Sequence, residues 1–222
     1  MKKIGSIMCR YKLIMFDMDG TLIKDRGIFK IAEKMNFKNE LLKLFSYKGS
    51  DFYNKSIEIA KLTKGMQKKE LLNIFRNIPF QDDLEDVIKI IKEKKIITAI
   101  ATDSYLFLAN DIKDRLSFDY AFANNLIINN GIITGELEIH NKNLIRDTYN
   151  GKIYSICKSH VLEQLCKKLN IRIKESIAVG DGKVDISMIK KAGLGIAFNA
   201  SIEVQKNADV VTNDMKIILN YI

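Results

Sequence analysis

The chain has 222 residues, 47% of them hydrophobic, which suffices for one large domain or for a domain with a smaller insert and excludes a disordered chain. Its first residues mix lysines with too few apolar residues for a signal peptide or a membrane span, so we expect a cytoplasmic protein without a membrane partner. The net charge of +9 is spread over lysines mixed with acids, which favours a solvated surface that attracts small anions such as phosphate esters over a nucleic-acid partner.

Short apolar runs rich in β-branched residues alternate along the chain with segments of helical periodicity, a pattern typical of parallel strands joined by crossover helices. The predicted strands are 13–16, 96–101, 176–180, 195–198 and 209–211. The predicted helices of this part are 82–94, 104–116, 159–169, 184–192 and 215–221. The predicted fold class is therefore α/β, with a Rossmann-like, doubly wound parallel sheet.

Residues 24–80 interrupt this alternation, because they show helical patterns but no strand. The predicted helices of this segment are 28–35, 40–45, 52–62 and 69–78. Pro79, the only proline, follows the last of them, where a helix is expected to stop. We therefore predict an α/β core domain formed by residues 1–23 and 81–222, with a helical cap, 24–80, inserted after the first strand.

A small β-hairpin is predicted from residues 126–128 and 132–135, because the Asn129-Asn130-Gly131 segment between them supplies left-handed turn conformations. The three cysteines, Cys9, Cys157 and Cys166, include no CxxC pair, so neither a disulfide framework nor a zinc site is indicated. We expect reduced thiols that are at least partly buried.

Polar side chains gather where the predicted strands end. Asp17 and Asp19 follow the first strand, Thr102 follows the second, Asp181 and Asp185 follow the third, and Lys158 opens a helix. Ligands of an open α/β sheet bind beyond the carboxyl ends of its strands, so these side chains are expected to converge on one crevice.

Several carboxylates in one crevice would repel one another unless a cation or a proton compensates. Oxygen ligands without a histidine or thiol cluster favour a hard ion, and Mg²⁺ is commonly held by a few carboxylates, water and substrate phosphate. A phosphoryl group would need its oxygens neutralised, for which Lys158 can supply charge and the Thr102 hydroxyl a hydrogen bond.

These residues, in this order, resemble the motifs of the haloacid dehalogenase (HAD) superfamily of phosphatases, and within it the archaeal-type branch of phosphoserine phosphatase-like enzymes. The DxDGT motif stands here as Asp17-Met18-Asp19-Gly20-Thr21, and GDGxxD stands as Gly180-Asp181-Gly182-Lys183-Val184-Asp185. Thr102 matches the strand-end hydroxyl of the second motif, and Lys158 matches the lysine of the third. The resemblance implies a Rossmann-like core with a helical cap.

It also implies roles for single residues. Asp17 would be the nucleophile that becomes an aspartyl phosphate, and Asp19 would be the general acid and then the general base. Mg²⁺ would be bound by the Asp17 carboxylate, the Asp19 carbonyl and Asp181, with Asp185 steadying the waters of the metal. The phosphoryl group would be held by Thr102, Asp103, Lys158 and Gly20, the last because glycine lets the backbone approach closely.

Each residue taken alone also has a purely structural explanation. Asp17 and Asp19 could form a turn, Thr102 could cap a helix, and Asp185 could be an acid in a first helical turn. Lys152 lies near Lys158 in the sequence and is the alternative for the third motif. The agreement of order and spacing favours the functional interpretation.

The chain departs from the phosphoserine phosphatase pattern where the leaving group would lie. Arg26 stands where that family carries a glutamate for the substrate ammonium, and the family's cap arginine aligns near Ala60, with Lys61 and Lys64 close by. Val184 replaces the asparagine before the last motif aspartate, and Asp103-Ser104 replaces two glycines.

We therefore predict that Arg26 and the cap lysines select a small anionic phosphate ester, such as a phosphorylated acid or a bisphosphate, that is not clearly phosphoserine. A phosphomutase remains an alternative, since it keeps both aspartates of the first motif. A basic binding module with a relict active site is the alternative outside enzymes. The sequence does not predict the oligomeric state.

Overall fold

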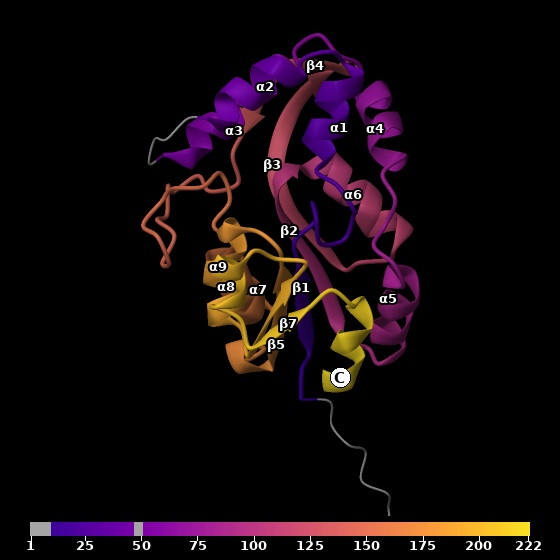
Figure 1. Ribbon diagram of the computed structural model, residues 1–222, viewed down its shortest axis with the longest axis vertical. Helices are drawn as coiled ribbons and strands as arrows, with labels where there is room; N and C mark the ends of the chain where they lie inside the picture. Colours follow the sequence, from indigo (N-terminus) through magenta and orange to yellow (C-terminus); the bar gives the residue numbers. More distant parts are fainter. Residues whose placement is uncertain (1–9, 47–50) are drawn as a thin grey trace, which may run out of the picture.

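Figure 1 shows the computed structural model, which describes residues 10–46 and 51–222. Its centre is a seven-stranded sheet in the order β4-β3-β2-β1-β5-β6-β7. Every neighbouring pair is parallel except β3 and β4, which are antiparallel. The strands are β1 (Leu13–Phe16), β2 (Ile97–Tyr105), β3 (Tyr120–Asn129), β4 (Ile132–Glu138), β5 (Ser176–Gly180), β6 (Leu194–Phe198) and β7 (Val210–Thr212). The predicted α/β class is confirmed.

Helices cover both faces of this sheet, because β1 is apolar on both sides. Ile14 and Phe16 belong to a core cluster with residues of α5 (Leu84–Glu93), α6 (Leu106–Arg115) and the 3₁₀ helix η3 (Met215–Tyr221). Leu13 and Met15 belong to a second cluster with residues of α7 (Lys158–Lys168) and α8 (Ile186–Lys191). The short elements η1 (Ile173–Glu175), η2 (Lys183–Asp185) and α9 (Ile202–Gln205) complete this half. The sheet is thus doubly wound.

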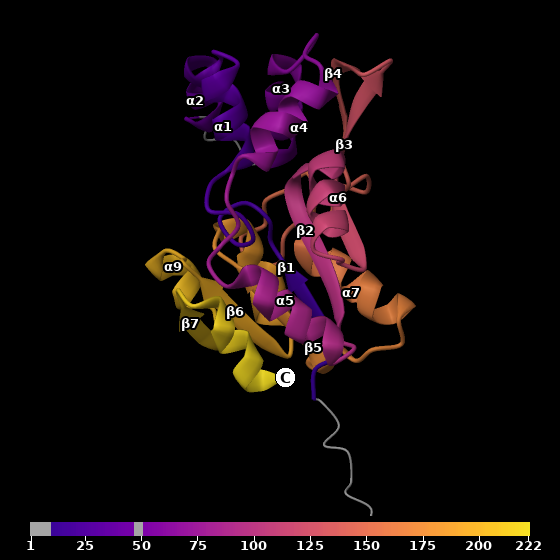
Figure 2. The ribbon, with the colours of Figure 1, turned by 90° about the vertical axis from the view of Figure 1, so that its right-hand side faces the viewer.

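The segment between β1 and β2 forms the inserted helices α1 (Gly27–Lys34), α2 (Lys38–Phe45), α3 (Phe52–Leu62) and α4 (Lys68–Arg76). Figures 1 and 2 show them together at one end of the molecule, beside the far end of the β3–β4 hairpin. The backbone joins the two parts, since Gly65 N–H donates to the Ile133 carbonyl at 2.8 Å and Gln67 forms a bridge with Ile132. The inserted helices therefore lie over one end of the sheet.

Two predicted boundaries are wrong around the second and third strands. β2 continues to Tyr105, beyond the predicted range 96–101, and α6 begins only at Leu106. β3 starts at Tyr120 as a strand of the main sheet, so the predicted hairpin strand 126–128 is only its far part. The Asn124 side chain supports both extensions, because it donates to the Asp103 carbonyl at 2.7 Å and accepts from the His140 N–H at 3.0 Å.

The other differences concern short helices. The predicted helix 184–192 is divided into η2 and α8, and 215–221 is a 3₁₀ helix. The predicted turn is confirmed, with φ of 49° at Asn130 and 80° at Gly131. Cys157 and Cys166 are buried free thiols, while Cys9 lies outside the described residues. Within the described part of the chain, no helix has both the length and the apolar character needed to cross a membrane.

Candidate active site

The register of β1 and β5 brings two predicted aspartates together. Phe16 pairs with Val179 across the parallel strands, and the Asp17 N–H donates to the Val179 carbonyl at 2.9 Å. Asp17 and Asp181 therefore leave neighbouring strand ends side by side. Carboxylate oxygens of Asp17, Asp181 and Asp185 all lie within 4.8 Å of one another.

Lys158, the first residue of α7, lies between two of these carboxylates. Its Nζ is 2.5 Å from Asp17 Oδ1 and 2.5 Å from Asp185 Oδ1, and its side chain is fully buried. Burial alone would lower the pKa of Lys158, but the two carboxylates hold it well above its usual range. The alternative, Lys152, instead lies with its ammonium 4.3 Å from the centre of the Phe52 ring.

The site carries more negative charge than Lys158 can neutralise. Burial, with Asp17 and Asp185 nearby, raises the pKa of Asp181 to about 8. Burial and Asp17 likewise raise the pKa of Asp185 to about 7. A bound cation would stabilise the ionised form of these carboxyl groups, and three clustered oxygen donors fit a hard divalent ion. The residues present therefore suit the metal that the sequence predicts, which we take up as a proposal below.

Asp19 lies outside this cluster and is held by the first inserted helix. Its Oδ1 accepts the N–H of Gly27, the first residue of α1, at 2.5 Å. Burial raises the pKa of Asp19 to about 7, although the Gly27 N–H opposes this shift. A carboxyl group with a pKa near neutrality can both donate and accept a proton at physiological pH.

Gly20 is required by Asp181. Gly20 has φ of +84°, and a Cβ added there would lie 2.6 Å from Asp181 Oδ2. The sequence predicted that Gly20 would let the backbone approach a phosphate, and the structure places a carboxylate against it. Any side chain at this position would displace Asp181.

Two residues that sequence reasoning missed support the same loop. Thr21 Oγ1 donates to Asp181 Oδ1 at 3.2 Å, and Gln81 Nε2 donates to the Gly20 carbonyl at 3.0 Å. Thr21 belongs to the DxDGT motif and could have been found there. No local pattern marks Gln81, because its contact spans residues far apart in the sequence.

Thr102 and Asp103 lie within the extended part of β2. Thr102 is fully buried, and its Oγ1 accepts the N–H of Ser104 at 3.2 Å, so its hydroxyl proton can still be donated. Asp103 lines the cavity, and its carboxylate raises the pKa of Asp19. Because this carboxylate would repel a phosphate, Asp103 could assist phosphate binding only through its backbone N–H.

Several of these residues line a cavity of about 620 Å³ between the sheet and the inserted helices. Asp17, Asp19, Asp181 and Arg26 all line it. The predicted cap residues near the leaving group do not: Ala60 is fully buried, Lys61 pairs with Glu58 at 2.5 Å, and Lys64 packs against Gly135. That part of the prediction is wrong, and Lys55 lines the cavity instead.

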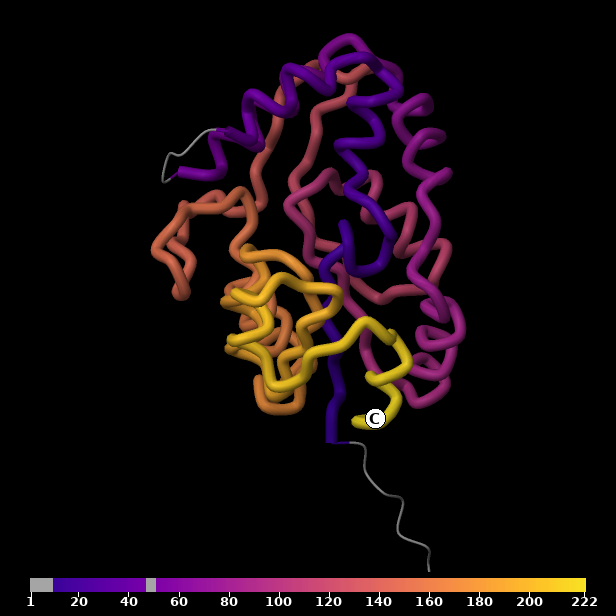
Figure 3. The backbone as a smooth tube through the Cα atoms, in the orientation of Figure 1, coloured from indigo at the N-terminus to yellow at the C-terminus, as the bar shows by residue number. Residues whose placement is uncertain are grey.

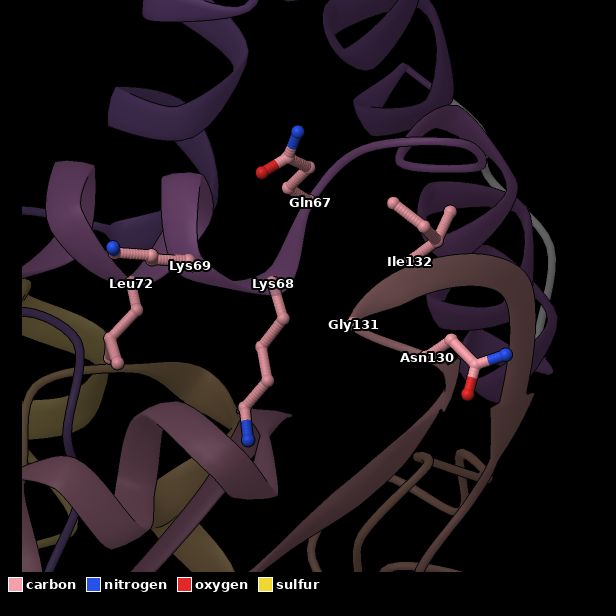
Figure 4. A pocket seen from close by; sticks show the side chains of 7 residues that line it. All are labelled: Gln67, Lys68, Lys69, Leu72, Asn130, Gly131 and Ile132. Atoms are coloured by element: carbon pink, nitrogen blue, oxygen red, sulfur yellow. The ribbon is translucent and has the colours of Figure 1, made fainter.

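A second cavity, of about 510 Å³, lies between the start of α4 and the β3–β4 turn (Figure 4). Lys68 and Lys69 point in different directions there, and the ammonium of Lys68 lies 5.8 Å from the centre of the Phe107 ring. None of the seven lining residues carries a carboxylate. The first cavity therefore holds the chemistry.

A doubly wound sheet with clustered aspartates and a buried lysine at its strand ends defines a class of hydrolase. The model of the haloacid dehalogenase-like hydrolases matches residues 11–193, and the chain belongs to that family.

The relatives identify it further as a phosphatase. The chain is 32% identical over 216 residues to a phosphoserine phosphatase of Methanocaldococcus jannaschii, covering 95% of this chain and 97% of that protein. A phosphoserine phosphatase whose structure was solved as an analogue of its phospho-aspartyl intermediate has a TM-score of 0.79 and 32% identity. This match covers 96% of this chain and 99% of that chain. A solved HAD-family hydrolase of Salmonella enterica has a TM-score of 0.83 and 25% identity, and the match covers 95% of this chain and 70% of that chain.

Proposed function

We propose that the chain is a Mg²⁺-dependent phosphomonoester hydrolase that acts through an aspartyl phosphate on Asp17. The observation that carries this proposal is the pairing of Asp17 with the buried Lys158 at 2.5 Å, beside a second carboxyl group, Asp19, in the same cavity. The lysine places a positive charge beside the attacking carboxylate of Asp17, while Asp19 can carry a proton. The relative solved as a phospho-aspartyl intermediate analogue supports the same chemistry.

In the first step, a carboxylate oxygen of Asp17 attacks phosphorus in line with the leaving oxygen. The new oxygen–phosphorus bond forms as the bond to the leaving alkoxide breaks, and Asp19 donates its proton to that alkoxide. A pKa of about 7 leaves Asp19 partly protonated at neutral pH, as this step needs. The alcohol then departs.

In the second step, the now ionised Asp19 removes a proton from water, whose oxygen attacks phosphorus. The bond between phosphorus and the Asp17 oxygen breaks, and inorganic phosphate leaves while Asp17 regains its carboxylate. Lys158 offsets the negative charge on Asp17 in both steps, and Thr102 donates its hydroxyl proton to a phosphoryl oxygen.

Asp17, Asp181 and the Asp19 carbonyl would hold the Mg²⁺ ion, with Asp185 orienting its water ligands. A bound divalent ion supplies positive charge against the phosphoryl oxygens. Gly20 serves this site by leaving room for Asp181, as its close approach to Oδ2 indicates.

The remaining parts of the proposal concern domains, substrate and location. Residues 24–80 would act as a cap on a core of residues 1–23 and 81–222, excluding water from the cavity during the first step. The substrate would be a small anionic phosphate ester with no requirement for serine, supported by the position of Arg26 in the cavity wall. A cytoplasmic location remains a prediction of the sequence.

The test is a panel of phosphate esters that includes p-nitrophenyl phosphate, assayed with Mg²⁺ on wild type, Asp17→Asn and Asp114→Asn. Asp114 is a matched control, because its side chain is 72% exposed on α6. We expect turnover by wild type and by Asp114→Asn, and none by Asp17→Asn. In wild type quenched with acid during turnover, mass spectrometry should find a phosphoryl group on the peptide that contains Asp17.

Activity retained by Asp17→Asn would overturn the assignment of the nucleophile. Isomerisation of a phosphorylated sugar that depends on a bisphosphate and releases no phosphate would indicate a phosphomutase. Absence of any turnover by wild type, together with salt-sensitive nucleic-acid binding, would favour a binding module with a relict site.

A further inference from the structure

Three cations that line the cavity have no carboxylate partner in the described parts of the chain. They are Arg26, just before α1, Lys55 of α3, and Lys152 of the loop 139–157 between β4 and α7. Among the described residues, none of the three forms an ion pair within 4.0 Å, whereas Lys183, which also lines the cavity, pairs with Glu203 at 2.5 Å. Unpaired cations in a cavity wall are suited to an anionic ligand.

Two of these cations are held against aromatic rings. The ammonium of Lys55 lies 4.5 Å from the centre of the Phe45 ring and 4.7 Å from that of Phe52. Lys152 lies 4.3 Å from the centre of the same Phe52 ring. These contacts fix the direction of both side chains but neutralise neither charge.

Lys55 is half-buried and lies near two like charges, those of Arg26 and Lys152. Its half-buried position lowers the pKa of Lys55, and the charges of Arg26 and Lys152 lower it further. Asp103 opposes this effect but does not outweigh it. A bound anion would relieve this repulsion, as an opposite charge favours the charged form of a lysine.

The three cations come from separate segments, two of which, α3 and the loop 139–157, are joined by hydrogen bonds. Figure 3 shows the loop 139–157 beside the start of α3, and Asp51 forms a backbone bridge with Ile153. The Tyr53 N–H donates to the Ile153 carbonyl at 3.0 Å, and Ser56 Oγ donates to Ser155 Oγ at 3.0 Å. An anion bound between them needs little rearrangement of the chain.

We propose that Arg26, Lys55 and Lys152 form a subsite for a second negatively charged group, a carboxylate or a phosphate, on the leaving group of the ester. This inference rests on the proposed function, because it places the scissile phosphate at Asp17. The apolar lining residues Ile28, Ile59 and Leu137 suit a short carbon chain. An ammonium group on the same chain would be repelled by the subsite.

The test compares esters that differ by one charged group. They are propyl phosphate, the phosphate ester of 3-hydroxypropanoate, propane-1,3-diol bisphosphate, and phosphoserine, which adds an ammonium to the second. We expect kcat/KM for the carboxylate or the bisphosphate to exceed that for propyl phosphate by about tenfold to a hundredfold, as for hydrogen bonds to a charged group. The better of the two anions identifies the ligand, and phosphoserine should be a poorer substrate than its deaminated analogue.

Variants locate the effect. Lys55→Met and Lys152→Met should each lower the preference for the anionic ester by about tenfold and leave the turnover of propyl phosphate unchanged. Lys55→Arg, which keeps the charge, should retain the preference for the anionic ester. Lys61→Met is the matched control, because Lys61 lies on the same helix, is exposed and pairs with Glu58. It should change neither ester.

Failure of this inference is distinguishable from failure of the proposed function. Equal kcat/KM for propyl phosphate and both anionic esters, or a preference for phosphoserine over its deaminated analogue, would overturn the subsite while leaving the phosphatase intact. Equal losses on neutral and anionic esters in Lys55→Met and Lys152→Met would also overturn it. Absence of turnover of propyl phosphate and of p-nitrophenyl phosphate by wild type would instead refute the proposed function.

Discussion

The two ends of the 620 Å³ cavity differ in how their charged side chains are paired. At the acidic end, the fully buried Lys158 of α7 lies 2.5 Å from both Asp17, which follows β1, and Asp185 of η2. At the other end, Lys55 and Lys152 are cations without an ion-pair partner in the described chain, held by an inserted helix and a loop. The sheet thus places the nucleophile Asp17 beside Asp181, while an inserted helix and a loop, which can change independently of the sheet, would select the leaving group.

The largest expected effect comes from breaking the ion pairs of Lys158 at the acidic end of the cavity, which we call the paired end; the other end is the cationic end. Lys158→Met leaves two buried carboxylates without their partner, which costs about 3 to 5 kcal/mol of unfolding free energy when a buried pair is broken. It also removes a charge that stabilises the phosphoryl group, so kcat/KM for p-nitrophenyl phosphate should fall by about 10²- to 10³-fold. Urea denaturation and steady-state kinetics measure the two effects.

The matched control for this variant is Lys167→Met, because Lys167 is exposed on the same helix, α7. It should leave both quantities unchanged. A Lys158→Met protein with unaltered stability and turnover would show that the paired end is not the reacting end.

Charge reversal at Arg26 sharpens the comparison, since Arg26 acts toward both ends. Arg26→Glu should lower kcat/KM for an anionic ester by about tenfold to a hundredfold, while Arg26→Lys retains most of it. Arg26 also lowers the pKa of Asp19, so the glutamate variant should shift the pH profile of propyl phosphate turnover to higher pH. Equal turnover of neutral and acidic esters by wild type and Arg26→Glu would refute the role of Arg26.

The sequence predicted the paired end better than the cationic end, and the reason is physical. The strands at 13–16 and 176–180 are continuous apolar runs, so their ends, and hence Asp17 and Asp181, could be located from local pattern alone. β3 was mostly missed, because its support from the Asn124 side chain depends on contacts distant in sequence.

The cation in α3 was assigned to the wrong residues for a related reason. Phe52, Lys55, Ser56 and Ile59 are spaced by three and four residues, so they share the helix face that lines the cavity. Lys61 falls outside that face. The spacing was visible in the sequence, but which face turns inward is decided by packing against the rest of the fold.

A smaller effect should follow from the pH dependence of the metal response. The folded pKa values of Asp19, Asp181 and Asp185 are raised to about 7, 8 and 7 from an ordinary 3.8, so without metal the folded state binds the extra protons. The contribution of these protonated carboxyl groups to the free energy of unfolding is fully present below their pKa in the unfolded chain. It is lost as the pH rises through their pKa values in the folded state. Mg²⁺ favours the ionised carboxylates, so its stabilising effect should grow over the same range.

Thermal unfolding with and without Mg²⁺ at about pH 5 and about pH 9 checks this, and the increase of Tm on adding Mg²⁺ should be larger at the higher pH by a few degrees. NaCl at equal ionic strength controls for screening, and Asp181→Asn should lose most of the response. An increase of Tm that is the same at both pH values would contradict the raised pKa values.

The smallest expected effect concerns how the cationic end is held. Ser56→Ala removes the 3.0 Å hydrogen bond from α3 to Ser155, whose hydroxyl still accepts the Asn124 side chain at 2.9 Å and is not left unsatisfied. The loss should therefore be about 0.5 to 1 kcal/mol, which lowers kcat/KM for an anionic ester by about two- to fivefold and leaves propyl phosphate unchanged. Ser46→Ala is the control, because Ser46 is exposed just after α2, and its hydroxyl donates to the Lys43 carbonyl of that helix at 2.7 Å. Equal losses on both esters would mean that α3 and the loop support the reacting end as well, and the two ends would no longer be independent.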